Sequence, residues 1–324
     1  MSSTQYGRKA SLLVMRPEVR GNNPSAFVPG KALDLSAFHF TFNTVQQDVE
    51  SPNNCSIRVF NLSRSTIEEI SKAEFSRVIL QAGYADSFGV IFDGTIKQFR
   101  LGRVNATTTY LDILAADGDI AYNYATINQT LAAGSTSEQR VDATVAAMNP
   151  YGVTKGYVSL NPTGGVLPRG KVLFGMPRAL LRQEAANNGA TWNISNGRVN
   201  VTPLKGYLPG EAVVLSAATG MIGLPEQTNE GLRVRSLLNP RIVVGGRVRI
   251  DNRSVNQTIQ QNPNAAPTAY NLRAGGPQRL ATITNDGIYR VFVAEYQGDT
   301  RGQDWYTNIV CLAVDASTDK VAAQ

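Results

Sequence analysis

In residues 38–42 every second side chain is an aromatic ring. Phe38, Phe40 and Phe42 alternate with polar residues. Side chains of a β-strand point alternately to opposite faces, so this spacing places all three rings on one face. A helix would turn the middle ring away from the other two. The pattern therefore predicts a strand with one face against a core.

The same alternation returns in short runs that are separated by turn-forming residues, a pattern typical of antiparallel sheets and barrels. In the first third of the chain these runs are Ser56–Leu62, Val78–Tyr84, Val90–Phe99 and Thr107–Ala115. One helical segment interrupts them. Ser65 and Glu68 have the spacing of a capping box, which predicts a short helix from Ser65 to about Ala73.

From about residue 126 the periodicity becomes helical, and two helices are predicted at Ser137–Met148 and Pro177–Asn188. A hairpin is predicted about Asn196-Gly197, because Asn-Gly favours a tight primed turn. After about residue 221 strands return, at Leu232–Leu237, Arg247–Asp251, Tyr289–Tyr296 and Asn308–Val314.

The chain is therefore predicted to be mainly β with a smaller α/β part. Its 324 residues are too many for one domain of average size. We expect a first β domain over residues 1–125, a mixed α/β domain over 126–220, and a second β domain over 221–324. The last of these contains a long polar loop at 258–286.

Composition limits the chemistry of the chain. Apolar residues make up 42% and charged residues 17%, which argues for a folded protein. Cys55 and Cys311 are too few for a disulfide-dense scaffold, and we expect two free buried thiols, with a single bridge as the alternative. The apolar run Leu12–Met15 is too short for a signal sequence or a membrane span, so the protein is expected to stay in the cytoplasm where it is made.

His39 is the single histidine, and this limits catalysis more than any other feature. A serine or cysteine triad would have to use it, and a site with several histidine ligands is excluded. The glycines match no nucleotide-binding motif. We therefore expect no catalytic residue, no metal and no other cofactor.

Two acidic loops remain as candidates. The aspartates at positions 117 and 119 and those at 299 and 304 are interpreted as turn formers, although paired carboxylates for glycan cleavage are an alternative. In the second loop, Arg301 is expected to pair with a neighbouring aspartate and to fix a hairpin that presents Trp305 to a partner.

Arginines are concentrated in two of the predicted strands. The net charge is +6, and six arginines lie between Gly231 and Arg253. Pairs of arginines two residues apart share one face of a strand. That face is either simply solvated or a positive surface for a partner's carboxylates or for DNA phosphates. The candidate interface or lumen residues are Arg233, Arg235, Arg247, Arg249, Arg301 and Trp305.

Several segments together resemble one protein family. They are Ile57–Ser63, Leu80–Tyr84, Val90–Ile96, Thr219–Pro225, Leu237–Pro240, Gly287–Val291 and Gly298–Thr307. In order and spacing these segments resemble the baseplate hub proteins of contractile-tailed bacteriophages.

The resemblance implies two tube-like antiparallel β-barrels that flank the mixed α/β domain, and three subunits in a ring. Such a homotrimer is a symmetry adaptor between the sixfold tail tube and the threefold central spike, with a bore through which DNA passes. The implied partners are further copies of the chain, the tail tube protein, the spike and other baseplate proteins, with no membrane.

The implied location is the virion tail baseplate, assembled in the cytoplasm of the host bacterium. Because the chain ends at Gln324 without an appended spike or lysozyme-like domain, any cell-wall cleavage is expected to belong to another chain. The alternatives are another component of a phage-like tail tube or tail tip, a glycan-cleaving enzyme that uses two carboxylates, and a DNA-binding protein.

Overall fold

The computed structural model describes residues 7–18, 28–71, 77–160, 166–228, 231–251 and 287–313, without the side chains of 16–18 and 28–31. The expected polar loop at 258–286 and the expected end of the first helix at Ala73 lie outside these ranges. The predicted fold class is confirmed, because the described chain is mainly β with a smaller helical part.

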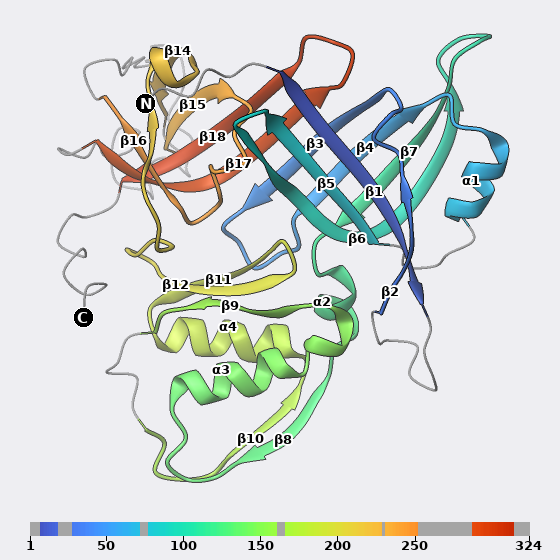
Figure 1. The fold of residues 1–324 in the computed structure, drawn as a ribbon. Helices are drawn as coiled ribbons and strands as arrows, with labels where there is room; N and C mark the ends of the chain where they lie inside the picture. Colours follow the sequence, from blue (N-terminus) through green and yellow to red (C-terminus); the bar gives the residue numbers. More distant parts are fainter. Residues whose placement is uncertain are drawn as a thin grey trace, which may run out of the picture.

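Thirteen strands form one sheet (Figure 1). Its order is β14-β15-β18-β17-β3-β4-β7-β6-β5-β1-β2, and β13 and β16 branch from β17. The first group of strands is β1 (Arg8–Glu18), β2 (Val28–Asp34), β3 (Phe40–Gln47), β4 (Asn54–Phe60), β5 (Arg77–Tyr84), β6 (Ser87–Arg103) and β7 (Thr109–Ala116). The second is β13 (Val213–Leu215), β14 (Met221–Gln227), β15 (Leu232–Leu237), β16 (Arg247–Ile250), β17 (Ile288–Asp299) and β18 (Trp305–Ala313).

The two groups of strands are joined by direct pairing. β3 runs antiparallel to β17, with Val45 opposite Glu295. One hydrophobic core therefore extends under both groups and contains buried residues from each, such as Phe40 and Tyr289.

Alternating burial accounts for the predicted strands. In β4, Cys55, Ile57 and Val59 are buried, while Asn54 and Ser56 are exposed. β1 was not predicted as a strand, since the run Leu12–Met15 was considered only as a targeting signal. Its Leu12 and Val14 in fact point into the core.

The first helix, α1 (Arg64–Ser71), begins earlier than predicted. The Thr66 amide donates to the Ser63 hydroxyl at 3.2 Å, so Ser63 rather than Ser65 caps the helix. Both serines precede a helical segment, and only the backbone geometry shows which hydroxyl reaches the free amide.

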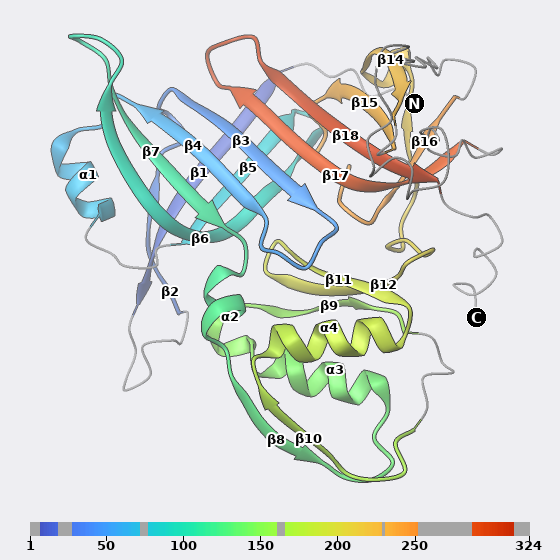
Figure 2. The same ribbon diagram turned by 180° about the vertical axis from the view of Figure 1, so that it is seen from behind.

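Residues 119–206 form a separate layered unit (Figures 1 and 2). Helices α3 (Ser137–Ala146) and α4 (Pro177–Asn187) lie between a three-stranded sheet and a two-stranded ribbon. The sheet contains β9 (Thr154–Val158), β11 (Ala190–Ser195) and β12 (Arg198–Pro203), and the ribbon contains β8 (Ile127–Leu131) and β10 (Lys171–Gly175). Shorter helical turns are α2 (Asp119–Tyr124), η1 (Asn149–Tyr151) and, outside the unit, η2 (Ala217–Thr219).

This unit, which we call the middle unit, has its own hydrophobic core around Trp192, Val141 and Leu181. Both predicted helices are present in it, and α4 begins at Pro177 as expected. The predicted hairpin is also present, with left-handed φ values of 52° at Asn196 and 72° at Gly197. In the described ranges no helix combines the length and apolar character that crossing a membrane requires.

Candidate interaction surface and buried junction

Arg233 and Arg235 lie on one exposed face of β15, as their spacing predicted. The intervening Val234 is buried in the core. The Arg235 guanidinium carbon lies 4.0 Å from the centroid of the Tyr306 ring on the neighbouring strand β18. This contact holds the Arg235 charge on the outer face of the sheet.

Arg247 and Arg249 share a face of β16, but they differ in what they contact. Arg249 is exposed. The Arg247 guanidinium lies 4.2 Å from the centroid of the Tyr207 ring and donates to the Gly210 carbonyl at 2.5 Å. Arg247 therefore holds the segment that leads from the middle unit into β13.

Arg301 is exposed in the turn between β17 and β18, and its side chain does not form the turn in the way we expected. The Asp299 carboxylate accepts the backbone amides of Arg301 and Gly302, each at 2.8 Å. It also contacts His39 Nε2 at 2.8 Å. Burial raises the pKa of the Asp299 carboxyl, but these hydrogen bonds outweigh burial and hold the pKa below its ordinary value.

The prediction that Trp305 faces a partner is wrong. Its side chain is 1% exposed, meets the Phe42 ring edge-on at a centroid distance of 5.4 Å, and donates to the Gly83 carbonyl at 3.3 Å. Trp305 is two residues from the buried Thr307, and the alternation of β18 directs both to the core.

The outer face of the sheet contains a polar groove of about 260 Å³ across β7, β4, β3 and β17. Short polar side chains such as Asn43 and Ser56 are among the residues that line it. At its side Arg58 binds Asp112 through two hydrogen bonds of 2.6 and 2.9 Å. Asp299 and Asp304 close the end next to the β17–β18 turn. The groove offers hydrogen-bond donors and acceptors to a protein partner.

His39 has a structural role. Its ring stacks on that of Phe60 with centroids 4.4 Å apart and an interplanar angle of 18°. Its Nε2 is bonded to Asp299, as described above. Within the described ranges no three His, Cys, Asp or Glu side chains are grouped closely enough to hold a metal ion.

In a second basic segment, between Lys155 and Arg182, these two residues form ion pairs within the chain. Lys155 forms ion pairs with Glu138 at 3.2 Å and Asp142 at 2.6 Å. Arg182 pairs with Glu50 of the 13-stranded sheet. These charges stabilise the middle unit and its attachment.

Behind the outer face, a buried ion pair joins three parts of the chain. Arg290 of β17 is 4% exposed and forms an ion pair with Asp48, which follows β3. Arg290 also donates to the Thr202 hydroxyl at 2.8 Å and to the carbonyls of Pro203 and Gly206 at 2.9 and 2.8 Å.

Asp48 extends this network into the middle unit. Its second oxygen accepts the Asn193 side-chain amide at 2.6 Å. Asn53, which is 3% exposed, donates from its side-chain amide to the Ile194 carbonyl at 2.8 Å. The junction is therefore built from hydrogen bonds to both oxygens of the buried Asp48 and to buried backbone carbonyls, while Nε of Arg290 has no hydrogen-bond partner among the described residues.

This network was not predicted from the sequence. Arg290 is the one charged residue in the apolar run Ile288–Ala294, and a charge inside such a run was the available signal. Tyr289 and Val291 face the core, whereas Arg290 lies on the opposite face of β17 and is buried there by Thr202, Pro203 and Gly206 of the middle unit.

Cys55 and Cys311 are both buried and free, as predicted. Burial raises the pKa of Cys55 to about 12, against a hydrogen bond with Thr44, and burial also raises the pKa of Cys311.

We expect neither cysteine to react with Ellman's reagent in the native protein at pH 8, because thiolate formation and access are both suppressed. Both should react in guanidinium chloride. Release of even one equivalent of thionitrobenzoate within minutes under native conditions would contradict the burial of these thiols.

Comparisons with known proteins agree with the fold. No family model and no curated protein sequence matches the chain. Among solved structures, the 43 kDa tail protein of prophage MuSo2 from Shewanella oneidensis matches with a TM-score of 0.54 and 9% identity, over 94% of this chain and 98% of that one. A tail protein from Neisseria meningitidis matches with a TM-score of 0.54 and 9% identity, over 94% of this chain and 96% of that one.

A third structure is the Escherichia coli c3393 protein, described as a type VI secretion component similar to the T4 bacteriophage tail proteins gp27 and gp5. It matches with a TM-score of 0.51 and 9% identity, over 86% of this chain and 74% of that one. At 9% sequence identity these matches show a similarity of fold. The resemblance to tail hubs that the sequence motifs indicate is confirmed at that level, and this chain has the fold of bacteriophage tail proteins.

Proposed function

We propose that this chain is a structural tail protein that acts as the baseplate hub of a phage-like contractile tail. Three copies form a ring that connects the sixfold tail tube to the threefold central spike and leaves a bore for DNA. The first and second β regions are the two ring-forming domains of each subunit, and the middle unit is the third domain.

One observation carries the proposal. Two groups of strands, over residues 8–116 and 213–313, are joined edge to edge in a single sheet, and the whole fold matches a phage tail protein over 98% of that protein's length. Two strand groups in each of three subunits give six sheet-built units, which is the number required to meet a sixfold tube.

The surfaces of the chain support an assembly role. Arg235 is fixed on the outer face of β15 by its contact with Tyr306. The polar groove beside Asp299 and Arg58 lies on the outer face of the same sheet. Interfaces of assembled proteins use such arginines and hydrogen-bonding groups around a packed centre. In the proposed ring, Arg233, Arg235 and Arg249 face either a neighbouring subunit or the bore.

Mass measurement in solution tests the ring. We expect purified protein to have the mass of three 34.9 kDa chains, and Arg235→Glu to weaken assembly by roughly tenfold or more, because reversing an interfacial charge costs about 1.4 kcal/mol or more. Arg64→Glu is the matched control, since that arginine is 94% exposed on α1.

Light scattering coupled to size-exclusion chromatography across a concentration series gives this measurement. A chain that stays monomeric at high concentration would count against the hub. An unchanged trimer in the Arg235→Glu variant would remove β15 from the interface while leaving the ring intact.

A further inference from the structure

The β11–β12 hairpin of the middle unit is fastened to the 13-stranded sheet at both of its ends. At the open end, the Arg290–Asp48 pair holds Thr202 of β12 and Asn193 of β11. At the turn, the Asp117 carboxylate accepts the Gly197 amide at 2.9 Å. The hairpin lies along the side of the middle unit nearest the sheet (Figures 1 and 2). A third contact, from the Asn53 side-chain amide to the Ile194 carbonyl at 2.8 Å, lies next to the turn. Together these contacts attach the hairpin to the sheet.

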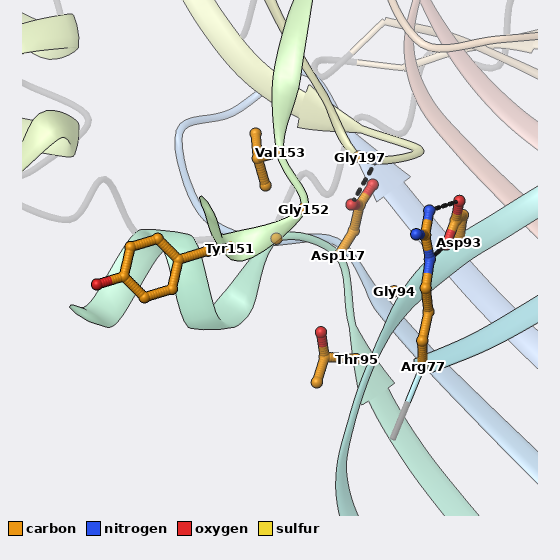
Figure 3. A pocket seen from close by; sticks show the side chains of 10 residues that line it. Arg77, Asp93, Gly94, Thr95, Asp117, Tyr151, Gly152, Val153 and Gly197 are labelled. Atoms are coloured by element: carbon orange, nitrogen blue, oxygen red, sulfur yellow. Dashed lines mark hydrogen bonds and ion pairs between the residues drawn. The ribbon is translucent and has the colours of Figure 1, made fainter. Parts of the chain in front are cut away.

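The burial of Asp117 is energetically unfavourable for its ionised form. The residue is 1% exposed, and its Oδ2 is buried with no hydrogen-bond partner among the described residues. It borders a cavity of about 20 Å³ between β5, β6, η1 and the hairpin turn (Figure 3). This volume is close to that of a single water molecule, so the cavity is not a substrate site.

The charged groups around Asp117 do not neutralise it. Arg77 of β5 is bound to Asp93 of β6 through two hydrogen bonds, one of them 2.5 Å long from Nε (Figure 3). Its positive charge is therefore shared with another carboxylate. Tyr151 is the titratable residue of η1 at the cavity, and the hairpin turn contributes the Gly197 amide. Nearby Asp119 is paired with Lys97 at 3.0 Å.

Burial raises the pKa of Asp117 from its ordinary 3.8 to about 7. Asp93 raises the pKa further. The amides of Gly197 and Asn196 and the charge of Arg77 act in the opposite direction and are outweighed.

We propose that Asp117 is a proton-operated latch, which holds the β11–β12 turn against the sheet when it is protonated and loosens the turn when it is ionised. Protonation removes a buried charge whose Oδ2 has no hydrogen-bond partner among the described residues. Ionisation favours an opened turn in which water solvates the carboxylate. Because Arg290 holds Thr202 and Asn53 holds the Ile194 carbonyl, opening is confined to the turn while the rest of the hairpin stays on the sheet.

The direction of the pH effect follows from linkage. The closed junction raises the pKa of Asp117, so the closed form binds its proton more tightly than the open form does. The stabilisation of the closed form is complete below the ordinary value of 3.8, falls as pH rises, and is lost once pH passes about 7. The β11–β12 turn is therefore held closed in mild acid and opens more readily above neutral pH.

Hydrogen exchange of the Gly197 amide in the full-length protein tests this proposal. After correction for intrinsic exchange chemistry, we expect the opening equilibrium to be roughly a hundredfold larger at pH 8 than at pH 5, since it changes about tenfold per pH unit between the two pKa values.

Asp117→Asn keeps an acceptor for the Gly197 amide and removes the ionisation. It should abolish the pH dependence and protect Gly197 better than the wild type at pH 8. Asp119→Asn, which changes the carboxylate two residues away, should keep the wild-type pH dependence.

The proposal is refuted if the opening equilibrium of the Gly197 amide in the wild type does not change with pH, or if it falls as pH rises. It is also refuted if the Asp117→Asn variant keeps the wild-type pH dependence of that equilibrium. If Asp117→Asn does not fold, the wild-type pH dependence of Gly197 decides, because an opening equilibrium that is constant between pH 5 and pH 8 would itself refute the latch. None of these outcomes depends on the oligomeric state, so they are separate from the test of the hub.

Discussion

Replacing Arg290 by alanine is expected to lower the free energy of unfolding by about 3–5 kcal/mol, because the change leaves the Asp48 charge buried without its cation. Asp48 is 4% exposed, and Arg290 also satisfies the Thr202 hydroxyl and the Pro203 and Gly206 carbonyls. Few single substitutions in this chain remove so many buried interactions. Urea unfolding followed by circular dichroism measures the change.

The matched control for Arg290 is Arg64→Ala. Arg64 is 94% exposed and pairs with Glu68 at 3.5 Å on the surface of α1, so its removal should change stability by no more than about 0.5 kcal/mol. A loss below about 1 kcal/mol for Arg290→Ala would mean that the junction is hydrated and that its ion pair does not hold the middle unit.

Replacing Trp305 by alanine is expected to cost about 3–5 kcal/mol, through lost apolar burial and the cavity left behind. Trp305 packs between the two strand groups, with Phe42 of β3 on one side and the Gly83 carbonyl of β5 at its indole nitrogen. The remaining tryptophan, Trp192, lies in the core of the middle unit. Fluorescence of the Trp305→Ala variant in urea therefore reports how the middle unit responds when the sheet core is weakened.

Phe174→Ala is the matched control for Trp305. Phe174 is an aromatic residue of the ribbon that is 74% exposed, so its replacement should change stability by no more than about 0.5 kcal/mol. Comparable losses at Trp305 and Phe174 would contradict the burial of Trp305.

The elements that could be predicted from the sequence are those with a local cause. The strand around Phe40 and Phe42 follows from alternation, and the β11–β12 hairpin follows from Asn196-Gly197, because a tight turn determines its own register. Buried, unbridged Cys55 and Cys311 also follow from the small number of cysteines and the apolar runs around them.

The errors come from residues whose environment depends on distant parts of the chain. Trp305 follows exposed turn residues, so it was assigned to the surface, but the curl of the sheet brings Gly83 and Phe42 to it from more than 200 residues away. Arg247 belongs to the predicted basic face, but Tyr207 and Gly210 engage it. Asp117 lies in a turn as predicted. Its burial could not be predicted, because it arises only when the β11–β12 turn packs against it.

By itself, the sequence determined the strand-rich character of this protein and the helices and hairpin of its middle part, because periodicity and turn chemistry act over a few residues. The order and spacing of its motifs also carried the resemblance to tail hubs. Only the tertiary structure decided that β3 pairs with β17, that Arg290 forms an ion pair with Asp48, and that Asp117 is buried away from solvent. Sheet pairing and desolvation depend on which distant segments come together. The spacing of residues along the chain does not show which charges will be buried in low-dielectric surroundings, where their interactions are strongest.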